Sequence, residues 1–334
     1  MRNILITGGA GFIGSNFIHY FLTTHPHYRI YNLDLLTYAG KIENMSEFFK
    51  HPNHTFIQGD ICDKKLLNQI FQTYQIDSVI HFAAESHVDN SICAPNIFIK
   101  TNIEGTFALL ETAYHHWMHK PFKPKNPHGI FHHISTDEVY GSLGDQGYFT
   151  ENTPYAPNSP YSASKASSDM LVRSYHHTYG LKTLITNCSN NYGPKQHDEK
   201  LIPTIIRQSL SNKPIPIYGD GLNVRDWLYV EDHCRGIDLV FHSNQYGETY
   251  NIGGNNEHTN IAITQTICSI LDELMPRKNG SYSDLITYVQ DRAGHDRRYA
   301  IDATKIKTQL GWEPRFSFDQ GIKKTIEWYL KLRR

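Results

Sequence analysis

The sequence has few of the features that mark secreted, membrane-spanning or metal-binding proteins. It contains five cysteines in 334 residues, and none of them belongs to a Cys-x-x-Cys pair. We therefore expect neither a disulfide framework nor a zinc site, and a reducing cytoplasm is the expected location. The 20 histidines include no His-Glu-x-x-His motif, so no bound metal is expected from their spacing.

Long apolar runs and an excess of one charge are also missing. No apolar run approaches the roughly 18 residues that a helix needs to cross a bilayer. The N-terminus lacks the apolar stretch and cleavage site of a signal peptide. The 32 Lys and Arg residues nearly balance the 33 Asp and Glu residues, which leaves a net charge of −1. Binding to nucleic acid or to a membrane through surface charge is therefore not expected.

What the chain does have is an alternation of short apolar strands and amphipathic helices. Its 334 residues suffice for about two domains. Strands connected by helices predict a parallel sheet with helices on both faces, so the expected fold class is α/β with a doubly wound sheet. The pattern predicts strands at 3–7, 29–33, 54–58, 78–82, 129–135 and 181–186, and helices at 12–22, 64–71, 97–115 and 161–179.

A glycine-rich turn lies between the first expected strand and the first expected helix. Residues 7–14 place Gly8, Gly11 and Gly14 in the spacing of the dinucleotide-binding loop of a Rossmann domain. Glycine allows a tight turn and close approach of the backbone to a pyrophosphate, which the start of the helix attracts. Asp34 follows the second strand, where a carboxylate accepts ribose hydroxyls and repels a 2′-phosphate. NAD is therefore the expected cofactor, and the alternative is a structural glycine turn with a surface aspartate.

The composition changes in the second half of the chain. Proline and glycine become frequent after about residue 186, and regular elements are expected to become short. We expect residues 1–186 to form the NAD-binding Rossmann domain and residues 187–334 to form mainly a smaller, mixed C-terminal substrate domain. Segments near 225–250 are expected to return to the first domain.

Two further positions fit the same cofactor. Asp60 and Ile61 follow the third expected strand, where an acid can face the adenine amine. Phe82, Ala83 and Ala84 end the fourth strand, where small residues let the cofactor lie against the backbone. Taken alone, Asp60 is equally well explained as a solvated loop acid.

Tyr161 and Lys165 form a Tyr-x-x-x-Lys pair on an expected helix. Their i, i+4 spacing puts both side chains on one face. An ammonium near a phenol lowers the pKa of the phenol, and such a tyrosine can remove a proton from an alcohol while hydride leaves for NAD. The pattern is common by chance, and its position after a dinucleotide-binding fold favours this interpretation over a surface pair.

The expected strand at 129–135 ends in a run of polar residues, Ser135-Thr136-Asp137-Glu138. The carboxyl end of a parallel strand beside a cofactor is where chemistry is expected. Two adjacent acids can act as an acid and a base if their environments separate their pKa values. The alternative is a solvated acidic turn.

Segments spread over nearly the whole chain carry a family resemblance. They read TGGAGFIGS (7–15), LDLLTYAG (33–40), HFAAESHVD (81–89), TNIEGT (101–106), ISTDEVYG (134–141), YSASKA (161–166), NCSNNYGP (187–194), EKLIP (199–203), RDWLYVEDH (225–233), GGNNEHTN (253–260) and DRAGHDRRYAID (291–302). They resemble the extended short-chain dehydrogenase/reductase superfamily and, within it, the dTDP-glucose 4,6-dehydratase family. Epimerases of this superfamily share the glycine loop and the Tyr-x-x-x-Lys pair but lack the acidic pair after Thr136.

The resemblance implies a reaction and a role for each catalytic residue. Tyr161, aided by Lys165 and Thr136, takes the proton of the sugar 4-hydroxyl while the C4 hydride passes to tightly bound NAD. Glu138 then removes the C5 proton, and Asp137 protonates the departing 6-hydroxyl. Hydride returns at C6, which leaves a 4-keto-6-deoxy sugar nucleotide and regenerates NAD. A homodimer built from the helices after Pro95 and around Tyr161 is also implied.

The resemblance and the residue patterns together define the expected binding residues. The chain departs from the family at one position, because the family usually has proline where this chain has Ala293. The expected cofactor contacts are Gly8, Gly11, Phe12, Ile13, Gly14, Asp34, Leu35, Leu36, Thr37, Asp60, Ile61, Phe82, Ala83, Ala84, Ser86, Thr101, Tyr161, Lys165 and Asn191. The expected contacts of the sugar-nucleotide substrate, dTDP-glucose, are Ser86, Thr136, Asn190, Lys200, Leu201, Pro216, Ile217, Tyr218, Arg225, Asn260, Asp291, Arg292 and His295.

Other functions remain open at this stage. The residue chemistry does not decide the nucleobase, so a dehydratase or epimerase that acts on a UDP- or GDP-sugar is the main alternative. A protein that only binds NAD and lacks catalysis is a second alternative, against which the intact Tyr161, Lys165, Asp137 and Glu138 argue.

Overall fold

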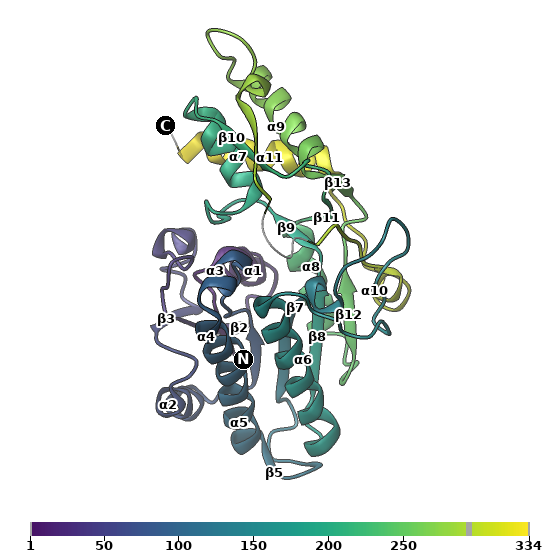
Figure 1. Cartoon of the computed structure of the whole chain (residues 1–334). Coiled ribbons are helices and arrows are strands. Elements are labelled where there is room, and N and C mark those ends of the chain that lie inside the picture. The colour runs from purple at the N-terminus through teal and green to yellow at the C-terminus, as the bar shows by residue number, and fades with distance from the viewer. Residues whose placement is uncertain (1, 292–295, 333–334) are drawn as a thin grey trace.

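A seven-stranded parallel sheet forms the centre of the computed structural model, which describes residues 2–291 and 296–332 (Figure 1). The strand order is β12-β8-β7-β4-β1-β2-β3, and every neighbouring pair runs parallel. The expected α/β class with a doubly wound sheet is therefore confirmed. The strands are β1 (Arg2–Thr7), β2 (Tyr28–Asp34), β3 (His54–Gln58), β4 (Ser78–His81), β7 (Ile130–Thr136), β8 (Thr183–Cys188) and β12 (Thr249–Ile252).

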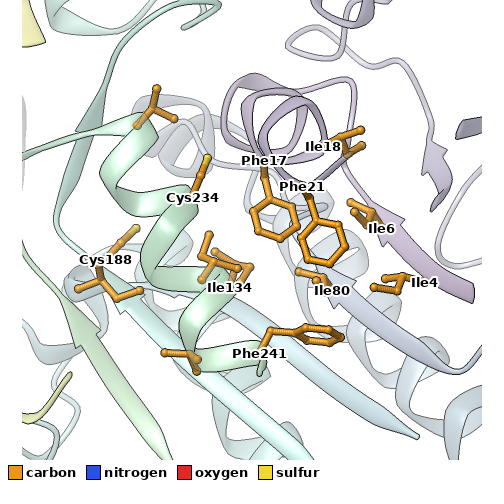
Figure 2. Packing of buried hydrophobic residues seen from close by; sticks show 14 of the residues in the cluster. Ile4, Ile6, Phe17, Ile18, Phe21, Ile80, Ile134, Cys188, Cys234 and Phe241 are labelled. Atoms are coloured by element: carbon orange, nitrogen blue, oxygen red, sulfur yellow. The ribbon is translucent and has the colours of Figure 1, made fainter. Parts of the chain in front are cut away.

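Side chains of the strands alternate between two hydrophobic layers. Leu5 of β1 faces one layer, while Ile4 and Ile6 face the other. Figure 2 shows Ile4 and Ile6 packed with Phe17 of α1 and with Phe241 of α8. The helices on this side are α1 (Phe12–Thr24), α8 (Val230–Phe241) and α10 (Thr304–Leu310), and those on the Leu5 side are α2 (Lys64–Tyr74), α5 (Thr106–Trp117) and α6 (Pro160–Tyr179).

The expectation of one regular helix over 97–115 is wrong. Helical turns run through this region, but a π-helical segment interrupts them. The carbonyl of Asn102 accepts hydroxyl hydrogen bonds from Thr106 and Ser168, each 2.6 Å long, which compete with the α-helical ladder. The segments are α3 (Val88–Cys93), α4 (Pro95–Phe98), the π-helix η2 (Ile99–Gly105) and α5.

The π-helical turn has a consequence for the loop after β4. The side chain of Asn102 accepts the N–H of Glu85 at 2.9 Å and donates to the carbonyl of Glu85 at 3.0 Å. It also donates to the hydroxyl of Ser164 on α6 at 2.8 Å. The loop that follows β4 is therefore fixed between two helices.

The later part of the chain adds a second unit above the sheet (Figure 1). Its core packs around Ile205, Ile263 and Ile322. The expectation of short elements is wrong here, because α9 and α11 have 15 residues each and apolar side chains recur at helical spacing, as at Ile263 and Ile267. Its helices are α7 (Leu201–Leu210), α9 (Asn260–Leu274) and α11 (Phe318–Leu332).

Short strands and turns complete the chain. β10 (Ile215–Tyr218) pairs with β14 (Ile286–Val289), and β11 (Val224–Tyr229) pairs with three other strands. Because α8 and β12 pack with the central sheet, the chain crosses between the two units more than once; the boundary at residue 186 stays a prediction. The remaining elements are β5 (Met118–Lys120), β6 (Lys123–Pro124), β9 (Asn190–Tyr192), β13 (Glu257–Thr259), β15 (Arg298–Tyr299) and the 3-10 turns η1 (Ile42–Met45), η3 (Asp137–Tyr140) and η4 (Tyr282–Leu285).

The structure also bears on the cysteines and on helices that could cross a membrane. The five cysteines are all free thiols. Within residues 2–291 and 296–332, no helix combines the length and the apolar character that crossing a membrane requires.

Candidate active site

A cavity of about 420 Å³ lies beyond the carboxyl ends of the central strands. It opens where the strand order reverses, between β1 and β4, which is where open α/β sheets bind their ligands. The segments that line it come from the ends of β1, β2, β3, β4 and β7, from α6, and from the region 188–200.

The glycine loop forms one wall of this cavity. Gly8 has a φ of +75°, which favours glycine, and a Cβ at Gly14 would lie 2.3 Å from the carbonyl oxygen of Gly8. Helix α1 starts at Phe12 after Gly11, and no side chain caps it. The N–H groups of its first turn and the positive end of its dipole are thus available to an anion in the cavity.

Asp34 lies at the end of β2 and lines the same cavity. Its carboxylate accepts the N–H of Ala10 at 2.9 Å and the N–H of Leu36 at 2.8 Å. Burial raises the pKa of Asp34, and these two hydrogen bonds lower it. The contacts fix the carboxylate beside the glycine loop, where its remaining lone pairs suit ribose hydroxyls.

The phenol of Tyr161 and the ammonium of Lys165 are both buried on α6. Burial raises the pKa of Tyr161 well above its ordinary value, and the charge of Glu138 raises it further. Burial lowers the pKa of Lys165 to about 8. The ammonium donates to the carbonyl of Ile134 at 2.8 Å and contacts Nε2 of His133 at 3.2 Å. The net shift of the Tyr161 pKa is therefore upward, against the expected lowering by Lys165.

The two adjacent acids at the end of β7 lie in different environments. Asp137 is 2% exposed, and burial raises its pKa well above the ordinary value, with further contributions from Glu138 and Asp226. Glu138 is half-buried, and its N–H donates to the hydroxyl of Thr136 at 3.3 Å. Burial therefore favours the neutral form of Asp137, next to a carboxyl group that is better exposed to water.

Sequence reasoning missed two buried groups behind Lys165. Nε2 of His133 lies 3.2 Å from Oδ1 of Asp169, and both side chains are 1% exposed. The hydroxyls of Ser135 and Tyr155 donate to Oδ2 of Asp169 at 2.9 and 3.0 Å. The spacing of Asp169, four residues after Lys165 on the same helix face, is a signal that would have identified it.

Further cavity residues were also missed, although all but Gln196 and His197 adjoin an expected one in the sequence. Glu85 precedes Ser86, and Lys100 precedes Thr101. The polar side chains added to the cavity in this way are Glu85, Lys100, Ser135, Ser189, Gln196, His197 and Glu199.

The structure brings most, but not all, of the expected residues to the cavity. All five expected catalytic residues line it, as do the expected cofactor contacts except Leu36. Of the expected substrate contacts, Ser86, Thr136, Asn190 and Lys200 line it. Leu201, Pro216, Ile217, Tyr218, Arg225, Asn260 and Asp291 are not part of its lining, and Arg292, Ala293 and His295 lie outside the described residues.

Arg225 is one of the expected substrate contacts outside this lining, and its role stays a prediction. Its guanidinium lies over the ring of Tyr299 at 4.3 Å. It donates to the carbonyls of Val224 at 2.8 Å and of Asp296 at 2.9 Å. In this structure the side chain therefore supports the second unit's backbone and does not line the cavity.

The fold and the cavity define a dinucleotide-binding enzyme of the extended short-chain dehydrogenase/reductase superfamily, with an acidic pair next to its Tyr-x-x-x-Lys residues. Residues 5–325 match the family described as GDP-mannose 4,6 dehydratase, and the chain belongs to this family.

Relatives with closely similar sequences agree with this assignment. The dTDP-glucose 4,6-dehydratase of Xanthomonas campestris pv. campestris is 54% identical over 331 residues, which cover 99% of this chain and 93% of the relative. The crystal structure of dTDP-glucose 4,6-dehydratase from Bacillus anthracis in complex with NAD has a TM-score of 0.87 at 48% identity and covers 99% of this chain and 97% of that chain. The dTDP-glucose 4,6-dehydratase DesIV from Streptomyces venezuelae, solved with NAD bound, has a TM-score of 0.90 at 44% identity and covers 99% and 98% of the two chains.

Proposed function

We propose that this chain is an NAD-dependent hydro-lyase that converts dTDP-glucose into dTDP-4-keto-6-deoxyglucose and water. One observation carries the proposal: a single cavity contains both the Thr136-Asp137-Glu138 run and the pair Tyr161 and Lys165. Simple oxidation of an alcohol needs only the tyrosine and lysine. The acidic pair supplies the two further proton transfers that elimination of water requires.

The residues around the glycine loop fit NAD. The uncapped start of α1 suits a pyrophosphate, and the carboxylate of Asp34 suits an unphosphorylated ribose. When bound, NAD supplies a hydride acceptor for C4, a hydride donor for C6 and a positive ring charge that favours the phenolate of Tyr161. Ala83 and Ala84 leave the end of β4 open to the cofactor.

The first proton transfer is assigned to Tyr161. Its phenol accepts the proton of the sugar 4-hydroxyl as the hydride leaves C4. A hydrogen bond from Thr136 lowers the pKa of Tyr161 and partly offsets the effect of burial. Lys165, one helical turn further along α6, adds positive charge on the same side of the cavity.

The elimination is assigned to the acidic pair. The C4 ketone acidifies the proton on C5, which Glu138 removes. Burial raises the pKa of Asp137 and so favours its protonated form, which can give its proton to the departing 6-hydroxyl. One water leaves, and a hydride at C6 and a proton at C5 complete the product.

Two polar residues, Asn190 and Lys200, extend the cavity towards the second unit. Lys200 donates to the carbonyl of Ser86 at 3.0 Å and lines the cavity, so its ammonium can face a diphosphate. The nucleobase is proposed to be thymine, because relatives about 54% identical are dTDP-glucose 4,6-dehydratases. The family's description names GDP-mannose instead, which makes a GDP-sugar the second candidate.

A competition assay tests the proposal. Equal concentrations of dTDP-glucose, UDP-glucose, GDP-glucose and GDP-mannose are incubated with the NAD-loaded enzyme, and products are identified by mass. We expect loss of one water from dTDP-glucose first. Preferred dehydration of a GDP- or UDP-sugar would reject the base assignment, and a C4 epimer as the sole product would reject the reaction.

A homodimer and a cytoplasmic location are part of the same proposal. Two segments that contact each other carry exposed apolar side chains: Ile97 and Ile99 are 40% and 45% exposed, and Met170 on α6 is 49% exposed. Burying them against a second copy would remove apolar surface from water. Five free cysteines suit a reducing compartment.

A further inference from the structure

Two helices that pack on the same face of the sheet end at a shared cluster of polar side chains. His25 is the residue that caps the C-terminus of α1, and His242 caps the C-terminus of α8. Asp238 lies in the last turn of α8 and is 10% exposed, between His25 at 19% and His242 at 34%. The cluster is therefore partly open to solvent, with its carboxylate innermost.

The three side chains converge on one point. Nε2 of His25 lies 2.9 Å from Oδ1 and 3.0 Å from Oδ2 of Asp238. Nδ1 of His242 lies 2.9 Å from Oδ1 of the same carboxylate, and one ligand atom from each residue lies within 4.8 Å of the other two. Ligands at zinc–ligand distances around a tetrahedral ion are about 3.4 Å apart, so each imidazole nitrogen, now 2.9 Å from Oδ1, would have to move away from it by about 0.5 Å to admit an ion.

Neighbouring groups hold these side chains in place. The hydroxyl of Tyr20 donates to Oδ2 of Asp238 at 3.0 Å. The hydroxyl of Tyr28 lies 3.0 Å from Nε2 of His242, so it can accept that nitrogen's proton and leave Nδ1 free as a ligand. Nδ1 of His242 also lies 3.0 Å from the backbone carbonyl of Asp238, a contact that coordination of an ion would replace. The two tyrosine hydroxyls hold the ligand side chains from the outside, as metal sites require.

An apolar layer lies beneath the cluster. The ring of Phe21 is 4.6 Å from that of His25 and 6.3 Å from that of Phe241. Figure 2 shows Phe21 and Phe241 in the packed layer between α1 and α8. The imidazoles of His25 and His242 are thereby confined, with centroids 4.7 Å apart.

The charge at this place also favours a cation. Each helix C-terminus carries roughly half a negative charge, and neither α1 nor α8 has a basic side chain in its last turn. The ionised carboxylate of Asp238 adds a full negative charge. The sum is about −2 when both imidazoles are neutral, which equals the charge that one divalent cation neutralises.

We propose that His25, Asp238 and His242 bind one divalent transition-metal cation of the zinc class, with water as the fourth ligand. Two imidazoles and one carboxylate are a common donor set for such ions. The ion would join the end of α1 to the end of α8. Helix α1 has 13 residues and is about 20 Å long, so this site lies a helix length from the glycine loop. Its role is therefore structural and independent of the proposed function.

The experiment uses the full chain, treated with a chelator and then titrated with Co²⁺ or Zn²⁺. Because 20 histidines can bind metal weakly, the readouts are the visible absorption of bound Co²⁺ and the calorimetric stoichiometry for Zn²⁺. We expect one equivalent to saturate the unaltered protein with the spectrum of a four-coordinate ion. His25→Ala and His242→Ala should each weaken that event by at least roughly tenfold.

His19→Ala is the matched control, because His19 is an exposed histidine on the same helix that lies 3.9 Å from Glu47. His19→Ala should bind the first equivalent of metal as tightly as the unaltered protein does. Equal binding by all four proteins, or no event above the weak background, would overturn the proposal. Circular dichroism and dehydratase turnover confirm that the variants fold. If a lower pH raises the melting temperature and Zn²⁺ does not, the cluster is a proton-binding site. That result would also overturn the proposal.

Discussion

Lys165 and Asp169 lie one turn apart on α6, and the side chains of both lie 3.2 Å from the same imidazole nitrogen of His133. Burial lowers the pKa of Lys165 to about 8, and the charge of Asp169 opposes that change. Burial also raises the pKa of Asp169 to about 6, against the effect of the ammonium. Asp169 is thus a positioning residue that helps to keep Lys165 charged at neutral pH.

Replacing that carboxylate should therefore change the pH dependence of the enzyme. In Asp169→Asn the pKa of Lys165 falls further, so its proton is lost at a lower pH. We expect kcat/KM to start falling at a lower pH on the alkaline side of its pH profile. The acid side of the profile, near pH 6, should change less. The control is Asp145→Asn in an exposed loop. An alkaline limb at the same pH in both variants would contradict the positioning role.

Glu138→Gln tests the base at C5. The amide cannot accept the C5 proton, while Tyr161 remains intact for the step at C4. We expect exchange of the C5 proton with deuterated solvent to fall by roughly 10²–10⁴-fold. NMR of recovered substrate and product measures the exchange. If exchange continues at the normal rate, another group is the base.

Asp137→Asn tests the acid for the 6-hydroxyl. The buried amide keeps the shape of the side chain but cannot give its proton to the leaving oxygen. Product formation should slow by roughly 10²–10⁴-fold, while exchange at C5 persists. Rapid-quench mass spectrometry follows the loss of water. Near-normal product formation would assign the acid elsewhere.

Asp34→Asn tests the preference for NAD. Two unit charges about 4 Å apart interact by about 1 kcal/mol even in bulk water, so removing the carboxylate should raise the affinity for NADP relative to NAD by at least about fivefold. Taking the ratio cancels any general weakening from the lost contacts with Ala10 and Leu36. Asp60→Asn, a second acid on the cavity wall, is the control and should leave the ratio nearly unchanged. Equal ratios in both variants would reject the role of Asp34.

The proposed dimer is tested at its exposed apolar side chains. Ile99→Asp and Met170→Asp would each bury an unpaired carboxylate, which costs about 3 kcal/mol or more, so the dimer should dissociate roughly 100-fold more readily. Light scattering over a concentration series measures this. Leu222→Asp, at a 45% exposed position in the second unit, is the control. Unchanged mass for the first two variants would place the interface elsewhere or exclude it.

The labelled hydride provides a test of the whole reaction. Substrate with deuterium on C4 should yield product with that deuterium in the new methyl group, because the same bound NAD returns what it receives. Loss of the label to added cofactor would contradict tightly bound NAD.

The sequence by itself determined the strands of the central sheet except β12, and it determined most of the residues that line the cavity. The glycine loop, Asp34, the run 135–138 and the Tyr-x-x-x-Lys pair are contiguous motifs at the ends of strands or on one helix face. Parallel strands bring their carboxyl ends to one edge of a sheet, so local order in the sequence suffices to place these residues together.

Only the tertiary structure decided what lies between elements that are distant in sequence. The contact of His133 with Asp169 and the π-helical turn at Asn102 depend on how α6 packs against the sheet and η2. His25 and Asp238 meet although 213 residues separate them. Arg225 turned towards backbone carbonyls that its own sequence neighbourhood does not reveal. Such contacts depend on helix packing and on the burial of charge, and neither leaves a periodic pattern in the sequence.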